Sequence, residues 1–154
     1  MVRLADLPEI DQAHLLGKAC EPLPGEPFVH GPPLTQRRVA IVTTAGLHPA
    51  GQPNFDLRDT DYRVIPGDVD GRDLVMSHSS VNFDRSGFQQ DINVVFPLER
   101  LRELADAGEI GSVASFHYAL NGAGWEPHEI EPTAAELARM LAADKVDAAV
   151  LVPV

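Results

Sequence analysis

Three histidines stand where polar side chains commonly gather into a site. His48, His78 and His117 each lie at or just past the end of an apolar, β-branched run. An imidazole ring titrates near neutral pH, so it can donate or accept a proton during a reaction. The sequence therefore predicts these three residues as candidates for proton transfer, although each could also satisfy backbone groups or pack in the core.

The stretch "MSHSSVNFDRSGFQQDINVVFP" places many polar side chains between two apolar elements. Asp84 could orient a histidine, or it could hold the loop through backbone N–H groups. We interpret Asp84 as a fourth candidate catalytic residue and leave both roles open. Asp91 precedes a predicted helix start, and aspartate is a favoured cap, so a structural role is predicted for it.

Four further residues are predicted to bind a substrate. The turn "TTAG" contains Thr44 and Gly46, whose backbone N–H groups could hold an anion such as a carboxylate. Ser77 precedes His78 in the same candidate pocket. Arg63 could clamp a carboxylate with its fork of donors, or it could pair with Asp59 or Asp61 for a structural purpose.

A metal site and a cysteine site are both less favoured. Zinc is often held by three histidines, but His48, His78 and His117 are separated by 30 and 39 residues, which fits no compact metal motif. We therefore expect no metal. Cys20 is the single cysteine, so an intrachain disulfide is excluded, and a lone thiol is more often inert than reactive.

The charge of the chain excludes some functional classes. The 154 residues include 12 basic and 23 acidic residues, for a formal net charge of −11. Such a chain would be repelled by nucleic acid and by anionic membranes. The sequence shows no targeting signal and no segment apolar enough to span a bilayer, so a cytoplasmic location is expected.

The chain divides into an arm and a domain. Residues 1–36 are predicted to be an N-terminal arm, because five prolines between 22 and 33 prevent a regular helix or a central strand. A short helix within the arm is possible at 11–18. Residues 37–154 are predicted to form the compact domain.

The compact domain alternates strand and helix patterns. A capping box is expected at Thr133 and Glu136, at the start of the second helix. The alternation predicts an α/β fold, a three-layer sandwich with a mostly parallel sheet of the flavodoxin or Rossmann type. The histidines should then converge at the carboxyl ends of the strands, where such sheets bind ligands. The predicted strands are 38–46, 61–66, 73–79, 110–119 and 146–154, and the predicted helices are 96–108 and 133–144.

Several blocks of the sequence, taken in order, resemble a known family. The similarity covers roughly residues 38–154. The chain resembles the selenoprotein B family of the glycine, sarcosine and betaine reductases, which includes the small selenoprotein subunit of D-proline reductase. The blocks are "VTTAGLH", "DYRVIPGDV", "MSHSS", "FDRSGFQQDINVVFPLERLRELADAGEIG" and "FHYALNGAG".

This resemblance implies a specific chemistry. Members of the family use a selenocysteine, or a cysteine in its place, within a U-x-x-C pattern. The selenolate attacks a substrate activated on a partner subunit, and reductive cleavage of a carbon–nitrogen bond follows. The resemblance implies a small amino acid or amine-like substrate and a partner reductase subunit, and we expect no cofactor.

The redox motif of the family would follow the strand at 146–154. The sequence ends at Val154, so we expect a truncated chain in which a UGA selenocysteine codon was read as stop, and the chain as written should be inactive. The alternative is a non-catalytic module that binds a ligand or supports assembly. A Pro-rich arm and an uncovered last strand also predict a homo-oligomer or a complex with a partner.

Overall fold

The computed structural model describes residues 3–17, 25, 28–80 and 85–154. The chain forms two units, residues 1–30 and residues 31–154, which we describe separately. The first unit contains a 3-10 turn at Leu4–Asp6 and helix α1 at Glu9–Leu16, and neither has a buried residue. The helix expected at 11–18 is therefore present, starting two residues earlier, while Lys18 lies outside the described residues.

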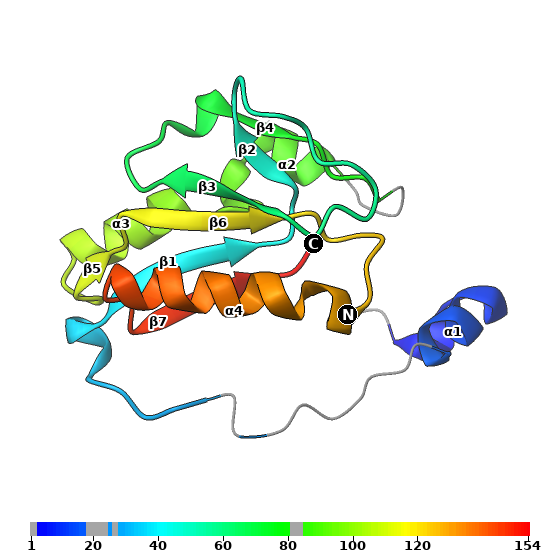
Figure 1. Ribbon diagram of the computed structural model, residues 1–154, viewed down its shortest axis with the longest axis horizontal. Coiled ribbons are helices and arrows are strands. Elements are labelled where there is room, and N and C mark those ends of the chain that lie inside the picture. The colour runs from blue at the N-terminus through cyan, green and yellow to red at the C-terminus, as the bar shows by residue number, and fades with distance from the viewer. Residues whose placement is uncertain (1–2, 18–24, 26–27, 81–84) are drawn as a thin grey trace. The chain divides into compact units, whose positions relative to one another are not determined.

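The second unit is built on a curled, mostly parallel sheet (Figure 1). Strand β1 is central and pairs in parallel with β5, β6 and β7. Strand β3 pairs with β6 in the antiparallel direction and forms one edge. The predicted α/β class with a mostly parallel sheet is confirmed. The strands are β1 Arg38–Thr43, β3 Tyr62–Pro66, β5 Ser112–Val113, β6 Phe116–Leu120 and β7 Ala148–Val152.

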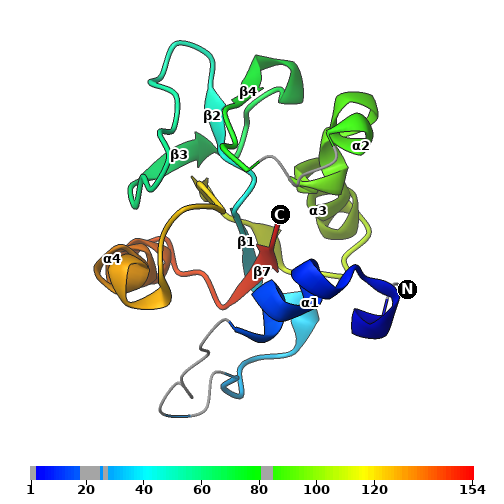
Figure 2. The same cartoon turned by 90° about the vertical axis from the view of Figure 1, so that its right-hand side faces the viewer.

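Helices pack on both faces of this sheet (Figure 2). Helix α3, Leu98–Asp106, buries Leu98 and Leu101 in the larger apolar cluster, which also contains Ile41 of β1. Helix α4, Pro127–Ala143, buries Leu137 against Tyr118 and Leu120 of β6. Because both faces of the central strands are covered, β1 is apolar from residue 39 to residue 42, as buried parallel strands usually are.

A second, two-stranded sheet was not anticipated. Strand β2, Leu47–Pro49, pairs in the antiparallel direction with β4, Leu74–Met76. The expectation that 73–79 forms a strand of the main parallel sheet was therefore wrong. An apolar run identifies a strand but not its partner, and here the partner is a three-residue segment too short to give a pattern.

The strand expected at 110–119 is interrupted. Strand β5 pairs with Arg38 and Val39, and β6 pairs with Val42 and Thr43, so the two follow one another along β1. The residues between them, 114 and 115, leave the strand path. His117 is consequently the second residue of β6 rather than its end.

The helices follow the predicted ranges in part. Helix α3 lies within the expected range 96–108, and Gly108 past its end has a φ of 73°, a conformation that favours glycine. Helix α4 begins six residues before the expected start, where Glu126 and Glu129 form the capping box. The capping role expected of Thr133 was wrong, since its hydroxyl donates to the Thr60 carbonyl at 2.8 Å.

Short helical segments occupy the polar stretch noted above. Helix α2 spans Ser86–Gln90, and a 3-10 turn follows at Ile92–Val94. Two other 3-10 turns lie at Leu34–Gln36 and Gly71–Asp73. Within the described residues, no helix has both the length and the apolar character needed to cross a membrane.

Candidate functional site

The carboxyl ends of β1 and β7 are tied together by Thr44. Its backbone N–H donates to the Val152 carbonyl at 3.0 Å. Its hydroxyl accepts from the Val154 N–H at 2.9 Å and donates to the Val154 carbonyl at 3.4 Å. The main chain just beyond β7 is thereby held against the end of β1, near the C-terminus marked in Figure 1.

Gly122 completes this junction from the end of β6. A Cβ atom built on Gly122 would lie 2.7 Å from the Val154 carbonyl oxygen, 2.8 Å from the Thr44 carbonyl oxygen and 2.9 Å from Nε2 of His78. Only a residue without a side chain permits such an approach. The close packing places the His78 ring beside the ends of three parallel strands.

His78 reaches the junction from the loop after β4. The Ser77 N–H donates to the Gly46 carbonyl at 2.9 Å. Gly46 has a φ of 63°, and a Cβ there would lie 2.8 Å from the backbone N and Cα of His78. The turn after β1 and the start of the His78 loop therefore pack main chain against main chain, which requires glycine at position 46.

The His78 ring has a defined orientation. Its Nδ1 accepts from the Ser80 N–H at 3.1 Å, so the neutral ring carries its proton on Nε2. Burial lowers the pKa of His78 below its ordinary value, a hydrogen bond to the Val154 backbone raises it, and the nearby positive charge of Arg85 lowers it. The residue is 4% exposed. A neutral ring that directs an N–H toward the end of β7 is a hydrogen-bond donor for a group placed there.

The predicted convergence of three histidines was wrong for His117. Its Nδ1 accepts from the Ile41 N–H at 3.0 Å, and its ring meets Phe96 edge to face at 5.6 Å between centroids. The side chain is fully buried in the body of the sheet. Burial, followed by the positive charge of Arg102, lowers the pKa of His117 to about 4. These contacts favour a structural role in the core.

His48 lies within β2 rather than beyond a strand of the parallel sheet. Its Nδ1 pairs with the Pro49 carbonyl at 3.0 Å, and its ring lies edge-on to Phe55 at 6.5 Å. It is 2% exposed. His48 was expected just past the end of a parallel strand. The chain instead forms β2 there, and β2 pairs with β4 in the second sheet.

The backbone N–H groups of the "TTAG" turn are used inside the fold. Those of Thr44, Ala45 and Gly46 donate to the Val152 carbonyl, the Thr43 hydroxyl and the Leu120 carbonyl. The turn therefore offers no spare amide for the anion that motivated the predictions for Thr44 and Gly46. What Thr44 supplies instead is its hydroxyl contact with Val154.

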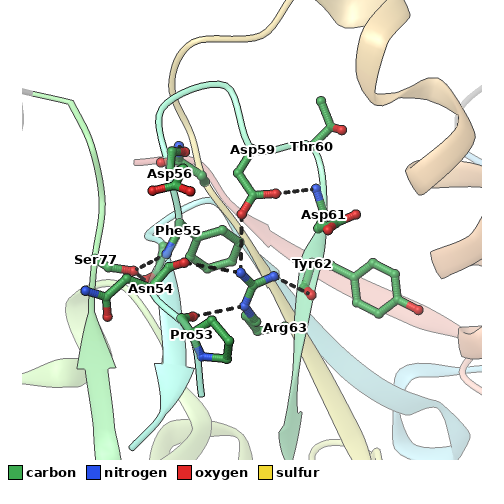
Figure 3. Close-up of polar contacts among 12 residues, drawn as sticks. Pro53, Asn54, Phe55, Asp56, Asp59, Thr60, Asp61, Tyr62, Arg63 and Ser77 are labelled. Carbon is green, nitrogen blue, oxygen red and sulfur yellow. Dashed lines mark hydrogen bonds and ion pairs between the residues drawn. The ribbon is translucent and has the colours of Figure 1, made fainter. Parts of the chain in front are cut away.

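Arg63 and Ser77 hold a loop (Figure 3). The Arg63 guanidinium donates to three backbone carbonyls and to Asp59 at 3.2 Å, and it stacks over the Phe55 ring at 4.2 Å. The Ser77 hydroxyl accepts from the Phe55 N–H at 2.8 Å. These contacts match the structural pairing of Arg63 with Asp59 that the sequence left open.

Asn121 is a buried residue of this region that the sequence did not single out. It follows β6, is fully buried, and bonds through its amide to Ser79, Asp56 and Ala123. The dipeptide "NG" indicates a turn, and that signal concealed the role of the asparagine.

Three residues considered in the sequence remain, namely Asp84, Cys20 and Asp91. Asp84 and Cys20 lie outside the described residues. Asp91 caps the turn at Ile92–Val94 by accepting from the Asn93 N–H at 2.9 Å, so its predicted capping role is confirmed. No cluster of three possible metal ligands occurs among residues that the structure describes.

An open hollow of about 510 Å³ lies beside the polar stretch, between the turn at Gly71–Asp73 and helix α2. Its lining includes Asp70, Arg72, Gln89, Gln90 and Glu99, and none of the predicted site residues that the structure describes. Asp70 and Arg72 pair with each other at 2.6 Å. Among the described polar residues of the stretch 76–97, Asp91 caps a turn, Gln89 and Gln90 line this hollow, and His78 lies at the strand junction.

A family model described as Glycine/sarcosine/betaine reductase selenoprotein B matches residues 23–154. The chain belongs to the selenoprotein B family. This finding confirms the resemblance drawn from the sequence blocks. The match includes the strand junction and the His78 loop.

Named relatives agree with this family. D-proline reductase subunit gamma of Acetoanaerobium sticklandii is 37% identical over 120 residues, which cover 77% of this chain and 49% of the relative. Betaine reductase complex component B subunit beta of Peptoclostridium acidaminophilum is 29% identical over 122 residues, covering 77% and 28%. Glycine reductase complex component B subunit gamma of the same organism is 27% identical over 122 residues, again covering 77% and 28%.

The chain spans about half the length of the first of these selenoprotein B relatives and a smaller share of the other two. No solved structure matches the chain.

Proposed function

We propose that this chain is part of a selenol- or thiol-dependent reductase subunit, in which the strand junction positions a chalcogen nucleophile beside His78. The substrate class would be a small amino acid or amine-like molecule that loses a carbon–nitrogen bond by reduction. Membership of the selenoprotein B family supports this class of chemistry, as do relatives named for D-proline and betaine.

The single observation that carries the proposal is the position of Val154. Its backbone meets the Thr44 hydroxyl, Gly122 and the His78 ring. A residue attached to Val154 would start from this junction. In the family pattern, that residue is the selenocysteine or cysteine.

The proposed role of His78 follows from its orientation. With Nδ1 engaged by the Ser80 N–H, the ring presents Nε2–H toward the junction. An N–H donor stabilises a thiolate or selenolate more than the neutral thiol or selenol, so it lowers the pKa of the nucleophile. His78 would act as this donor, and His117 and Arg63 would act in packing.

The 154 residues contain one cysteine, Cys20, and reduction of a carbon–nitrogen bond needs two electrons. A chalcogenol and a thiol can supply both electrons when they are oxidised to a bond between them. Hydroxyl side chains such as Thr44 and Ser77 carry no such redox couple. We therefore expect no reductase turnover from residues 1–154 alone.

The test compares residues 1–154 with an extended form in which a Cys-x-x-Cys pair and a helix follow Val154. Both forms carry Cys20→Ser, so that the new thiols alone are measured. The rate of alkylation against pH should give the first new cysteine a pKa below the free value of about 8.5. His78→Ala should move that pKa back toward the free value, and His48→Gln, which alters a buried ring in β2, should leave it low.

Two results would contradict the proposal. One is a new thiol that titrates like free cysteine and ignores the replacement of His78. The other is reduction of a substrate by the short form with dithiothreitol at the rate of the extended form.

An assembly role is the second candidate. Strand β7 pairs with β1 alone among the described strands, and Leu151 on it is 72% exposed. Exposed apolar surface on an edge strand favours association, either with a second copy or with a partner reductase subunit. Light scattering on the purified chain tests self-association, and a monodisperse monomer would leave only the partner subunit.

A further inference from the structure

Asn121 joins three loops at the end of β6. Its Nδ2 donates to the Asp56 carbonyl at 3.0 Å and to the Ala123 carbonyl at 3.3 Å. Its Oδ1 accepts from the hydroxyl of Ser79 at 3.0 Å. A fully buried amide with this many partners restrains each of the loops that it contacts.

The main chain of Asn121 is fixed as well. It forms an isolated antiparallel bridge with Ala45, in the turn after β1. Its carbonyl accepts a hydrogen bond from the indole N–H of Trp125. These two main-chain contacts fix the position of Asn121, so its side-chain amide can hold Ser79 in a defined place.

Ser79 is the partner that matters for the candidate site. Its backbone N–H and hydroxyl both face Oδ1 of Asn121, at 3.4 and 3.0 Å, and the hydroxyl also lies 2.8 Å from Nδ2. Ser79 stands between His78 and Ser80, whose N–H engages Nδ1 of the His78 ring. When Ser79 is held in place, the tight turn is also held in which the Ser80 N–H bonds to Nδ1 of the His78 ring.

We propose that Asn121 is a positioning residue that acts through Ser79 to keep the His78 ring in one tautomer, with Nε2–H at the strand junction. The importance of that tautomer for chemistry rests on the proposed function, in which a group placed after β7 also accepts from the N–H. The positioning itself rests on the hydrogen bonds alone. The hydrogen bonds of the Asn121 side chain go to Ser79, Asp56 and Ala123, so its effect on the His78 ring is indirect.

A purely structural asparagine would behave differently. Its loss would lower the stability of the fold and leave the His78 ring unchanged in the molecules that remain folded. A positioning asparagine predicts a local change at His78 under conditions where the protein is fully native. The state of the ring, rather than stability, therefore decides between the two.

The experiment records nitrogen-15 NMR spectra of the histidine rings across a pH titration of the whole chain. In the parent, we expect His78 to show the Nε2–H tautomer and a pKa below the ordinary value. In Asn121→Ala, we expect a mixture of tautomers and a pKa closer to the ordinary value, because the loosened turn admits water. His117, in the core, should keep its resonances.

Matched variants make the result specific. Ser79→Ala removes one hydroxyl and leaves Asn121 in place, so it should shift His78 in the same direction even if Asn121→Ala fails to fold. Asn93→Ala is the control, because the Asn93 amide bonds to Asp91 and Glu99, at the turn before α3. Arg85, which donates to the His78 carbonyl at 2.8 Å, is the charged group facing His78 from the described chain, and it stays unchanged throughout.

Each outcome has a definite meaning. Unchanged His78 resonances in folded Asn121→Ala or Ser79→Ala would overturn the proposal. A shift at His78 in the Asn93→Ala control would overturn it too, since the effect would then be general. If His78 shifts as expected while the thiol of the extended form ignores His78, then the positioning stands and the proposed function fails.

Discussion

His117 shows how one side chain can repair a break in a sheet. The chain leaves the strand path at residues 114 and 115, between β5 and β6. The Ile41 N–H of β1 faces this break and is accepted by Nδ1 of His117 instead of by a carbonyl. A buried N–H without a partner would cost about 1–3 kcal/mol, so the ring has a structural value of that order.

The same residue predicts a pH dependence of stability. Burial lowers the pKa of His117 from its ordinary 6.5 to about 4 in the folded protein. As the pH falls below 6.5, the unfolded chain takes up the proton first, so the free energy of unfolding decreases. Between pH 7.5 and pH 5 the loss should be about 2 kcal/mol, and the stabilisation is fully present only above 6.5.

His117→Asn tests this expectation, because the asparagine oxygen can accept from Ile41 but does not titrate. Urea unfolding at pH 7.5 and pH 5 should show a smaller difference between the two pH values in the variant than in the parent. His128→Asn, an exposed change in the first turn of α4, is the control. An equal pH dependence in parent and His117→Asn would show that His117 does not carry the effect.

Some residue roles could be predicted and others could not. The cap at Asp91 depends on neighbours within two positions, so local rules were sufficient. Asn121 bonds to residues 42 and 65 positions away, and no local pattern reports such contacts. The prediction for His78 succeeded in location because its loop reaches the strand ends, although its own strand belongs to another sheet.

At the scale of elements, the close approach of three strand ends depends on Gly122. A methyl group there would meet two backbone carbonyl oxygens at 2.7 and 2.8 Å, so the strands would have to separate. Gly122→Ala should lower the free energy of unfolding by about 1–3 kcal/mol, the usual cost of overpacking. It should also perturb the His78 ring resonances.

The matched control is Gly87→Ala in α2, where the nearest atom to an added Cβ is a Val94 side-chain carbon at 3.8 Å. That change should leave stability within about 0.5 kcal/mol, or raise it slightly, because alanine favours a helix. Equal urea midpoints for Gly122→Ala and the parent would show that the junction is looser than described.

Helices and strands were predicted correctly where the signal lies within the element itself, and they were missed where the structure depends on contacts with distant residues. Helix α3 has a strong apolar stripe and a glycine past its end, and it was placed correctly. The start of α4 was missed because Pro127 and Glu126 stand among loop-like residues, although proline suits a first turn. The pairing of β2 with β4 was missed because pairing is set by tertiary contacts rather than by either segment alone.

At the scale of the whole chain, the two units differ in how they are stabilised. Every residue of the hydrophobic core identified in the described chain lies at or after Val39. Helix α1 and the turn before it bury none of their residues. The family match also begins within the first unit, at residue 23, and continues through the whole of the second. Residues 31–154 therefore have the core needed to fold alone.

Two truncations test where the independent unit begins. A form spanning 31–154 should melt within about 3 °C of the full chain, since none of the described residues before 31 is a buried apolar residue. A form spanning 37–154 should melt lower by about 5 °C, because residues 31–36 make specific contacts with the domain. Arg37 donates to the Pro32 carbonyl at 2.7 Å, and a Cβ on Gly111 would lie 2.5 Å from the carbonyl carbon of Gln36.

Thermal unfolding by circular dichroism measures both truncated forms, and histidine NMR on the 31–154 form checks the site. The His78 tautomer and titration should match those of the full chain, because every contact that we ascribe to that ring lies between residues 44 and 154. Equal melting of the two truncated forms would place the boundary after residue 36, as the proline-rich composition suggested. A large loss of stability in the 31–154 form would instead mean that the first unit stabilises the domain.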